Sequence, residues 1–410
     1  MMGEWKEYRY TDLATIIGGG TPKTSVSDYW NGEIPWLSVK DFLPVTKYVY
    51  DTEKHISELG LLNSSTKLLE KNDIVISARG TIGAMAMIPY PMCFNQSCFG
   101  LRGNNVVDKN FLYYLTQTKV NELRKSAHGS VFDTITRETF DNLRCLVPPL
   151  QTQQKIGNIL SSLDSKIELN KRINDNLEQQ AQALFKSWFV DFEPFKEGMF
   201  VDSELGMIPE SWRVCSAETI FKINIGKTPP RKEQQWFSNI NNGNVKWISI
   251  SDLGSNEIFI EDSKEYLTKE AISKFNIIVV PEDTILVSFK LTVGRVGISN
   301  CELTTNEAVA RFYLPKSYFR EYTYLSLKKY NYARLGSTSS IATAVNSKII
   351  KNMKLLIPPV TIISEFSKRI NPLFNAIRIY ENEIRNLSKI RNTLLPKLMS
   401  GELKINDINN

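Results

Sequence analysis

Two stretches of the chain place apolar residues at spacings that alternate between four and three. The positions in the first stretch are Ile156, Leu160, Leu163, Ile167, Leu177, Ala181, Leu184 and Trp188. The positions in the second stretch are Phe366, Ile370, Leu373, Ile377, Tyr380, Ile384, Leu387, Arg391, Leu394 and Leu398. This seven-residue repeat predicts a coiled-coil seam. Since each position of the second stretch lies 210 residues after a position of the first, we expect two equivalent helices packed on each other.

A Pro-Pro pair precedes each stretch, at 148–149 and at 358–359. Proline suits the first turn of a helix because the amide hydrogen that it lacks has no partner there. Each helix then spans about 40 residues, or about 60 Å. The long connections between the two repeats predict that the helices run antiparallel within one chain.

Three polar residues interrupt the seam: Asn170, Asn174 and Arg391. One interpretation is that they occupy solvated positions or helix ends. The other is that they set the register, because a buried asparagine disfavours slipped pairings at a cost in stability. The sequence leaves both interpretations open.

The residues before each helix have a β-rich pattern of short Val/Ile runs, glycine turns and tryptophans. The run DIVISARGTIG (73–83) of the first half matches TILVSFKLTVG (284–294) of the second, and IPWLSVKDF (34–42) matches VKWISISDL (245–253). Helical spacing inside the first half also predicts a helix over 110–125. The chain is therefore a tandem repeat of a globular part followed by a helix.

We predict an α+β fold, a tandem duplication in which two mixed α/β domains are separated by two long antiparallel coiled-coil helices. The expected parts are a first domain over 1–147, a helix over 148–192, a linker over 193–208, a second domain over 209–357, and a second helix with the C-terminal tail over 358–410.

Composition limits the chemistry that the chain can perform. The net charge of +6 permits a nucleic-acid partner without requiring one. Five scattered cysteines without a CxxC pair argue for reduced thiols and against a zinc site, and only two histidines are present. The Gly-Lys-Thr run at 226–228 lacks the upstream glycine of a phosphate-binding loop, because Phe221 stands there. No apolar run reaches the roughly 18 residues that a membrane helix needs. We expect a cytoplasmic protein with no catalytic residue, metal or cofactor of its own.

Alternating side chains provide a first set of candidate DNA contacts. Residues two apart in a strand share a face, so a cation and two hydroxyls are expected side by side in each half. The two sets are Ser77, Arg79, Thr81 and Ser288, Lys290, Thr292. Such a face can bind phosphate oxygens or a base edge, although surface ion pairs would explain the same pattern.

Two further regions could contact DNA. Glycine amides and basic side chains at 18–23 and 226–232 suit phosphate, but a plain turn between strands would look alike. The face of Trp36, Ser38 and Lys40 is matched by Trp247, Ser249 and Ser251, although tryptophans are more often core residues. The predicted DNA-binding residues are Lys23, Ser38, Lys40, Ser77, Arg79, Thr81, Ser130, Lys227, Arg231, Ser249, Ser288, Lys290, Thr292, Arg295 and Ser337.

Differences between the halves carry information about the ligand. Positions that grip phosphate should be alike in both halves, whereas positions that read bases should differ if the half-sites differ. Lys40 corresponds to Ser251, and GSVFDTIT (129–136) corresponds to GSTSSIATA (336–344). If each half of the chain reads half of a DNA target, we expect a target with two unlike halves.

The order and spacing of these elements resemble the specificity subunit of type I restriction–modification systems over nearly the whole chain. The residues that carry the resemblance are IIGGGTPKT, INIGKTPPR, IPWLSVKDF, VKWISISDL, PPLQTQQKI, LFKSWFVDFEPF, MIPESW and LLPKLMSGEL. The second helix departs from the pattern, because PPVTIISEF lacks the glutamine-rich start of PPLQTQQKI.

The resemblance implies that each β-rich domain is a target-recognition domain that reads half of a split double-stranded DNA sequence. It implies that the helices act as a spacer and dock two methyltransferase subunits, which restriction/translocase subunits then join. S-adenosylmethionine and ATP would bind to those partners. Two alternatives are a self-contained methyltransferase or nuclease with unrecognised motifs, and a coiled-coil adaptor that ignores DNA.

Overall fold

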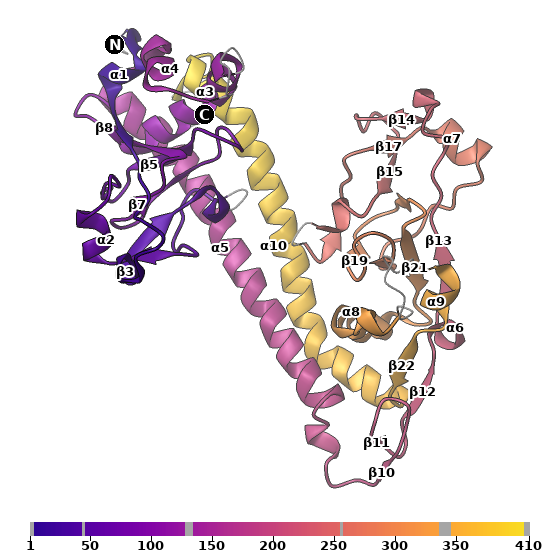
Figure 1. Ribbon diagram of the computed structural model, residues 1–410. Coiled ribbons are helices and arrows are strands. Elements are labelled where there is room, and N and C mark those ends of the chain that lie inside the picture. The colour runs from indigo at the N-terminus through magenta and orange to yellow at the C-terminus, as the bar shows by residue number, and fades with distance from the viewer. Residues whose placement is uncertain (1–3, 43–45, 128–133, 255–256, 336–345, 406–410) are drawn as a thin grey trace. The chain divides into compact units, whose positions relative to one another are not determined.

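The structure is a computed structural model that describes residues 4–42, 46–127, 134–254, 257–335 and 346–405 (Figure 1). The chain divides into two compact units. Unit 1 combines Met1–Leu169 with Ile384–Asn410, and unit 2 is Asn170–Glu383. Each unit therefore holds one globular part together with half of each long helix.

Unit 1 is built around short strands and one longer helix. Its strands are β1 (Lys6–Arg9), β2 (Ala14–Gly18), β3 (Trp30–Leu37), β4 (His55–Ile56), β5 (Ile74–Ser77), β6 (Met85–Met87), β7 (Cys93–Phe94), β8 (Cys98–Gly103) and β9 (Arg144–Val147). Its helices within the globular part are α1 (Tyr10–Leu13), α2 (Glu58–Leu62), α3 (Lys109–Ala127) and α4 (Arg137–Asn142). The helix predicted over 110–125 is confirmed as α3.

The strands of unit 1 form three small sheets. One has the order β2-β8-β5-β6 with antiparallel neighbours, and another has the order β4-β3-β7, in which β3 and β7 are parallel. The third pairs β1 with β9, so the start and the end of the globular part close on each other.

Unit 2 repeats this plan. Its strands are β10 (Phe200–Val201), β11 (Ile208–Pro209), β12 (Arg213–Ser216), β13 (Lys222–Ile225), β14 (Phe237–Ser238), β15 (Val245–Ile248), β16 (Phe259–Ile260), β17 (Tyr266–Leu267), β18 (Ile285–Ser288), β19 (Val296–Ser299), β20 (Thr304–Thr305), β21 (Val309–Tyr313) and β22 (Lys354–Ile357). Its shorter helices are α6 (Ala217–Ile220), α7 (Lys269–Lys274), α8 (Arg320–Lys329) and α9 (Ser347–Lys351).

The sheet orders of the two units correspond strand by strand. The sheet β13-β21-β18-β19 matches β2-β8-β5-β6, β17-β15-β20 matches β4-β3-β7, and the β12-β22 pair matches β1-β9. Even the parallel contact of β16 with β19 has an equivalent, the bridge between Tyr48 and Met87. The tandem duplication is therefore confirmed.

The central strands are buried on both faces. Ile74 and Ile76 of β5 pack into the main core of unit 1, whereas Val75 between them packs into a second apolar cluster on the other side of the sheet. Ile285 and Val287 of β18 behave in the same way in unit 2. This explains why these strands are continuous apolar runs instead of alternating ones.

The long helices are α5 (Leu150–Phe189) and α10 (Val360–Ser400), the magenta and yellow helices of Figure 1. In unit 1, the start of α5 packs with the end of α10, since Ile156 and Leu160 share a core cluster with Leu398. In unit 2, the end of α5 packs with the start of α10, since Phe185 and Phe366 are in ring contact. The predicted antiparallel arrangement is therefore present in each unit.

Two of the three polar seam residues, Asn170 and Arg391, have largely buried side chains. Asn170 is fully buried and its amide donates to Glu383 at 2.8 Å in unit 2. Arg391 forms an ion pair of 2.6 Å with Asp164 in unit 1, and their side chains are only 13% and 10% exposed. The burial of Asn170 and Arg391 favours the interpretation that polar residues define the register of the helix pair.

The segment predicted as a linker is folded. It contains a short 3-10 turn, Glu193–Phe195, and the β10-β11 hairpin. Phe195 stacks edge-on against both Trp188 and Trp212. Aromatic packing therefore fixes the path from α5 into the globular part of unit 2. Among the described residues, no helix is both long and apolar enough to cross a bilayer.

Candidate nucleic-acid interface

The hairpins that follow β5 and β18 have the same construction. The Ser77 hydroxyl donates to the Thr81 carbonyl and accepts the amide hydrogen of Ala84 at 2.9 Å. The Ser288 hydroxyl donates to the Thr292 carbonyl at 2.6 Å and accepts the amide hydrogen of Arg295 at 3.0 Å. Each serine therefore ties the two sides of its turn together.

Glycine is required once in each turn. Gly83 and Gly294 have φ values of 81° and 90°, and their amides donate to the carbonyls of Ser77 and Ser288. These φ values lie in the left-handed region, which glycine enters without a steric penalty. The two hairpins thus share hydrogen bonds, backbone conformation and position in the sheet.

This geometry corrects the expected face of alternating side chains. The strands end at Ser77 and Ser288, so neither serine shares a strand face with the residues that follow it. Both serines are fully buried, and their hydroxyls are used within the turn. Ser77 and Ser288 therefore position the hairpins and do not offer a hydroxyl at the surface.

The exposed tips of the hairpins carry the remaining predicted residues. Arg79 and Thr81 are exposed in unit 1, and Lys290 and Thr292 are exposed in unit 2. Each tip therefore presents a cation and a hydroxyl two residues apart, the groups that commonly bind phosphate oxygens. Between them lie Gly80 and Leu291, which the sequence analysis did not single out.

The glycine loops are held by buried tryptophans. The indole N–H of Trp36 donates to the Gly20 carbonyl at 3.0 Å, and that of Trp247 donates to the Lys227 carbonyl at 3.1 Å. Trp36 and Trp247 are 7% and 1% exposed, which agrees with a core role. The loops and their tryptophans form one structural motif that occurs in both units.

Several amides of these loops are already hydrogen-bonded within the protein. The Gly20 amide donates to Phe94 at 3.0 Å, and the Lys227 amide donates to Thr305 at 3.0 Å. A Cβ atom at Gly226 would lie 2.0 Å from the Thr305 carbonyl oxygen, so close backbone packing requires this glycine. The amides of Gly20, Gly226 and Lys227 are therefore not available to phosphate, whereas the basic side chains of the loops are candidates.

The basic side chains of the glycine loops differ in their partners. Lys23 is exposed. The Lys227 ammonium lies 3.3 Å from the Phe275 carbonyl. Arg231 makes a two-point ion pair with Glu265 at 2.8 and 2.9 Å, which raises the pKa of Arg231. Because its charge is already compensated, Arg231 is a weaker candidate for phosphate than Lys23.

Ser38 and Ser249 are partly buried and begin short 3-10 turns. Their hydroxyls donate to Asp41 at 2.8 Å and to Asp252 at 2.6 Å. Lys40, the middle residue of the first of these turns, is exposed, and its ammonium lies 3.9 Å from the Glu53 carboxylate. The serines are therefore structural in this state, while the Lys40 side chain stays accessible.

Arg295 is also engaged within the protein, because its guanidinium donates to the Ile250 carbonyl at 2.8 Å and lies against Gly254. The predicted contacts Ser130 and Ser337 lie outside the described residues. The structure thus narrows the exposed candidates to Lys23, Lys40, Lys227 and the hairpin tips, and their role in DNA binding stays a prediction.

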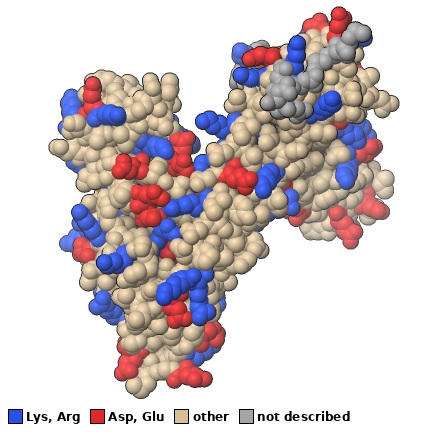
Figure 2. All heavy atoms as spheres, turned by 180° about the vertical axis from the view of Figure 1, so that it is seen from behind, with Lys and Arg blue, Asp and Glu red and all other residues tan. Residues whose placement is uncertain are grey.

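Charge on the molecular surface is mixed. Figure 2 shows Lys and Arg side chains interspersed with Asp and Glu over the visible face, without one continuous basic field. A modest net charge of +6 distributed in this way supports binding through local contacts more than through bulk attraction.

Other chemistry has little support in the described residues. No cluster of three or more His, Cys, Asp or Glu side chains with metal-binding geometry occurs there. The five cysteines are free, and burial raises the pKa of Cys93 to about 11 and that of Cys98 to about 12. Thiols with such pKa values are poor nucleophiles at neutral pH.

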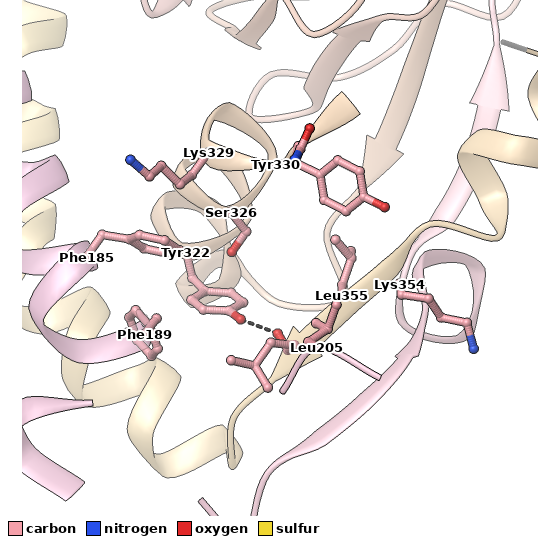
Figure 3. Close-up of a pocket in the computed structure, with 11 residues that line it drawn as sticks. Phe185, Phe189, Leu205, Tyr322, Ser326, Lys329, Tyr330, Lys354 and Leu355 are labelled. Atoms are coloured by element: carbon pink, nitrogen blue, oxygen red, sulfur yellow. Dashed lines mark hydrogen bonds between the residues drawn. The ribbon is translucent and has the colours of Figure 1, made fainter. Parts of the chain in front are cut away.

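A pocket of about 190 Å³ lies between α5, α8 and β22 of unit 2 (Figure 3). Phe185, Phe189 and Leu355 give it an apolar lining. The Tyr322 hydroxyl in this lining already donates to the Leu356 carbonyl. The described residues that line this pocket include no His, Cys, Asp or Glu side chain.

Comparison with known proteins gives a consistent result. The family described as "Type I restriction modification DNA specificity domain" matches residues 2–179 and 209–389. The type I restriction enzyme MjaIX specificity subunit of Methanocaldococcus jannaschii is 30% identical over 419 residues, covering 99% of this chain and 95% of the relative. The HindI specificity subunit of Haemophilus influenzae is 25% identical over 472 residues, covering 98% and 100%.

A solved structure agrees on the fold. The S subunit of a type I restriction–modification system from M. genitalium superposes with a TM-score of 0.60 at 16% identity, covering 97% of this chain and 96% of that chain. These matches confirm the resemblance and the fold class that the sequence predicted.

Proposed function

The chain belongs to the type I restriction modification DNA specificity family, and on this premise we propose that each unit reads one half of a split double-stranded DNA target. The chain acts as the specificity subunit of its system. In this proposal it selects the sequence, and partner subunits carry out the reaction.

The duplicated hairpin tip carries the proposal. In both units an exposed cation and threonine project from a turn that a buried serine and a left-handed glycine hold in one shape. Arg79 and Lys290 occupy the same point of the two units. A protein that binds two half-sites would use such equivalent cations once in each half-site. The equivalence supports a common task for both tips, the binding of backbone phosphates.

Differences between the units support a target with unlike halves. The exposed Lys40 of unit 1 corresponds to Ser251 of unit 2, and the exposed Gly80 corresponds to Leu291. Side chains that reach base edges determine sequence, so unlike side chains select unlike half-sites. The proposed target is therefore non-palindromic.

The long helices are the proposed docking surface for two methyltransferase subunits, which restriction/translocase subunits would join. Apolar side chains that are about half exposed or more support this role: Leu169 and Ile390 in unit 1, and Val360 and Ile379 in unit 2. Apolar side chains exposed on the long helices would be buried by subunits that dock there. S-adenosylmethionine and ATP would bind to the partners, and this chain would hold neither.

Genome-wide mapping of methylated bases tests the proposal, with the gene present, deleted and restored. We expect deletion to remove methylation at one split motif, with two short unlike halves around a fixed gap, and restoration to bring it back. Unchanged methylation while the methyltransferase subunits are present would contradict the proposal. The adaptor interpretation would then be preferred if the purified complex also lacked salt-dependent duplex binding.

A further inference from the structure

The tip of the β18-β19 hairpin presents a leucine to solvent in an unusual conformation. The Leu291 side chain is 97% exposed, the highest exposure among the large apolar residues of the described chain. Its φ of 57° lies in the left-handed region, which a side chain with a Cβ atom enters only at a cost. Both its exposure and its backbone are therefore unfavourable in the isolated protein.

The equivalent residue in unit 1 is a glycine, the residue type that suits this backbone conformation. Gly80 occupies the same point of the turn with a φ of 71°, and a Cβ atom placed there would meet no atom within 4 Å. Glycine would relieve the backbone strain at little packing cost, since the Leu291 side chain is almost fully exposed. The fold therefore gives no reason for a leucine at 291, and strain kept at an exposed tip indicates a ligand.

Hydrogen bonds fix the backbone of the turn that carries this side chain. The Ser288 hydroxyl bonds to the Thr292 carbonyl at 2.6 Å, and the Gly294 amide donates to the Ser288 carbonyl at 2.9 Å. Phe289, next to the tip, is 1% exposed. The leucine is thus presented on a rigid support, so little conformational entropy is lost when it binds.

The neighbours of Leu291 indicate what kind of ligand it meets. Lys290 and Thr292 are exposed on either side of it, as Arg79 and Thr81 flank Gly80. A cation and a hydroxyl around one apolar group fit a DNA groove, where phosphates line the edges and bases form the floor. The main apolar group on a base edge in the major groove is the C5-methyl of thymine.

We propose that Leu291 is a specificity-determining residue that packs against a thymine methyl group in the half-site read by unit 2. The inference rests on the proposed function and deepens it. Gly80 leaves the corresponding position of unit 1 without an apolar contact. One part of the difference between the two half-sites then comes from this single position.

The test uses the chain assembled with its methyltransferase subunits and duplexes that carry the methylated motif. Each thymine of the second half-site is replaced in turn by deoxyuridine, which removes only the methyl group. Binding is measured by fluorescence anisotropy for the wild type, Leu291→Gly and a control, Leu62→Ala. Leu62 is another exposed leucine, 78% exposed, in α2 of unit 1. Glycine is suited to a positive φ, so the variant keeps the turn.

We expect one thymine at which deoxyuridine weakens wild-type binding about fourfold, the factor for one buried methyl group. Leu291→Gly should bind the thymine duplex about tenfold more weakly and be indifferent to deoxyuridine at that base. Leu62→Ala should behave as the wild type. A Leu291→Gly protein that binds as tightly as wild type overturns the proposal.

Two other results are also decisive. Weaker binding of Leu291→Gly with an unchanged response to deoxyuridine at every thymine overturns methyl recognition and indicates a wedge between base pairs or a protein contact. Failure of the wild-type complex to prefer its motif over unrelated DNA would instead overturn the proposed function. The two failures are therefore distinguishable.

Discussion

Replacing Asp164 by asparagine should destabilise unit 1 strongly, because it leaves a buried guanidinium without an anion. The Arg391 side chain is 13% exposed and lies 2.6 Å from the Asp164 carboxylate, and the Tyr114 hydroxyl donates to the other carboxylate oxygen. Removing one partner of such a buried pair costs about 3–5 kcal/mol. We expect a loss of this size for Asp164→Asn and for Arg391→Met.

The double variant Asp164→Leu with Arg391→Met should be less damaging than either single change. Replacing a buried ion pair by apolar side chains of similar volume is often neutral or stabilising. Unit 2 already contains an apolar version of the contact, since the equivalent residues Phe374 and Ala181 are fully buried in its core cluster. We expect the double variant to lose about 1–3 kcal/mol, less than either single change, because the buried Tyr114 hydroxyl no longer donates to a carboxylate.

Hydrogen exchange measured by mass spectrometry can follow α5 and α10 of unit 1 without reporting on unit 2. The single variants should lose protection at 150–169 and 384–400, whereas the double variant should keep it. The buried ion pair does not stabilise unit 1 as expected if Asp164→Asn lowers the free energy of unfolding by less than about 1 kcal/mol. The same holds if the double variant lowers the free energy of unfolding by as much as the two single changes together.

Three further predictions concern a buried lysine, the two hairpin serines and an exposed arginine. Burial lowers the pKa of Lys47 from 10.5 to about 8. Between pH 8 and pH 10.5 the unfolded chain therefore binds more protons at this residue than the folded chain does. The free energy of unfolding of unit 1 should therefore rise from pH 8 to 9.5, and Lys47→Met should abolish the rise in pH-dependent denaturation. Ser77→Ala and Ser288→Ala each remove a buried hydroxyl that bonds to both sides of its turn, so each should cost about 1–3 kcal/mol, measured as faster hydrogen exchange confined to its own hairpin. Arg79→Gln should weaken binding to all duplexes, and in a salt titration it should lower the slope of log affinity against log salt by about one. A loss of binding to some sequences only, with an unchanged slope, would contradict the phosphate assignment.

Regular periodicity made the helices and the duplication predictable. The seam of α5 and α10 followed from apolar spacing alone, and α3 appears within two residues of its predicted bounds at each end. Such patterns span many residues, so a local exception does not obscure them.

The candidate site was harder to predict because it depends on where strands end. A strand through Ser77 and Arg79 was a reasonable expectation from alternation, but the chain turns after Ser77, with Gly80 and Gly83 in the left-handed region. A serine hydroxyl that bonds to its own turn looks the same in sequence as one that faces DNA. Aligning Gly80 with Leu291 would have drawn attention to the hairpin tip, since a leucine seldom replaces a glycine in a tight turn.

The ion-pair partners of charged residues could likewise not be predicted from the local sequence pattern. Arg231 and Glu265 are 34 residues apart, and Arg391 and Asp164 are 227 apart. Only the folded chain brings them together. Whether a cation is available for DNA therefore depended on tertiary contacts, and the structure reassigns Arg231 from a free cation to a paired one.

If each unit reads its own half-site, replacing the globular part of one unit with that of the other should change the DNA target in a defined way. Residues 209–357 would be exchanged for a second copy of residues 2–147, because each globular part is closed by a pair of terminal strands, β1 with β9 and β12 with β22. Methylated bases would then be mapped in cells that carry this variant with the methyltransferase subunits. We expect a new methylated motif in which the first half-site occurs twice and the second half-site is lost. Methylation of the original motif, or of a motif that keeps the second half-site, would contradict it.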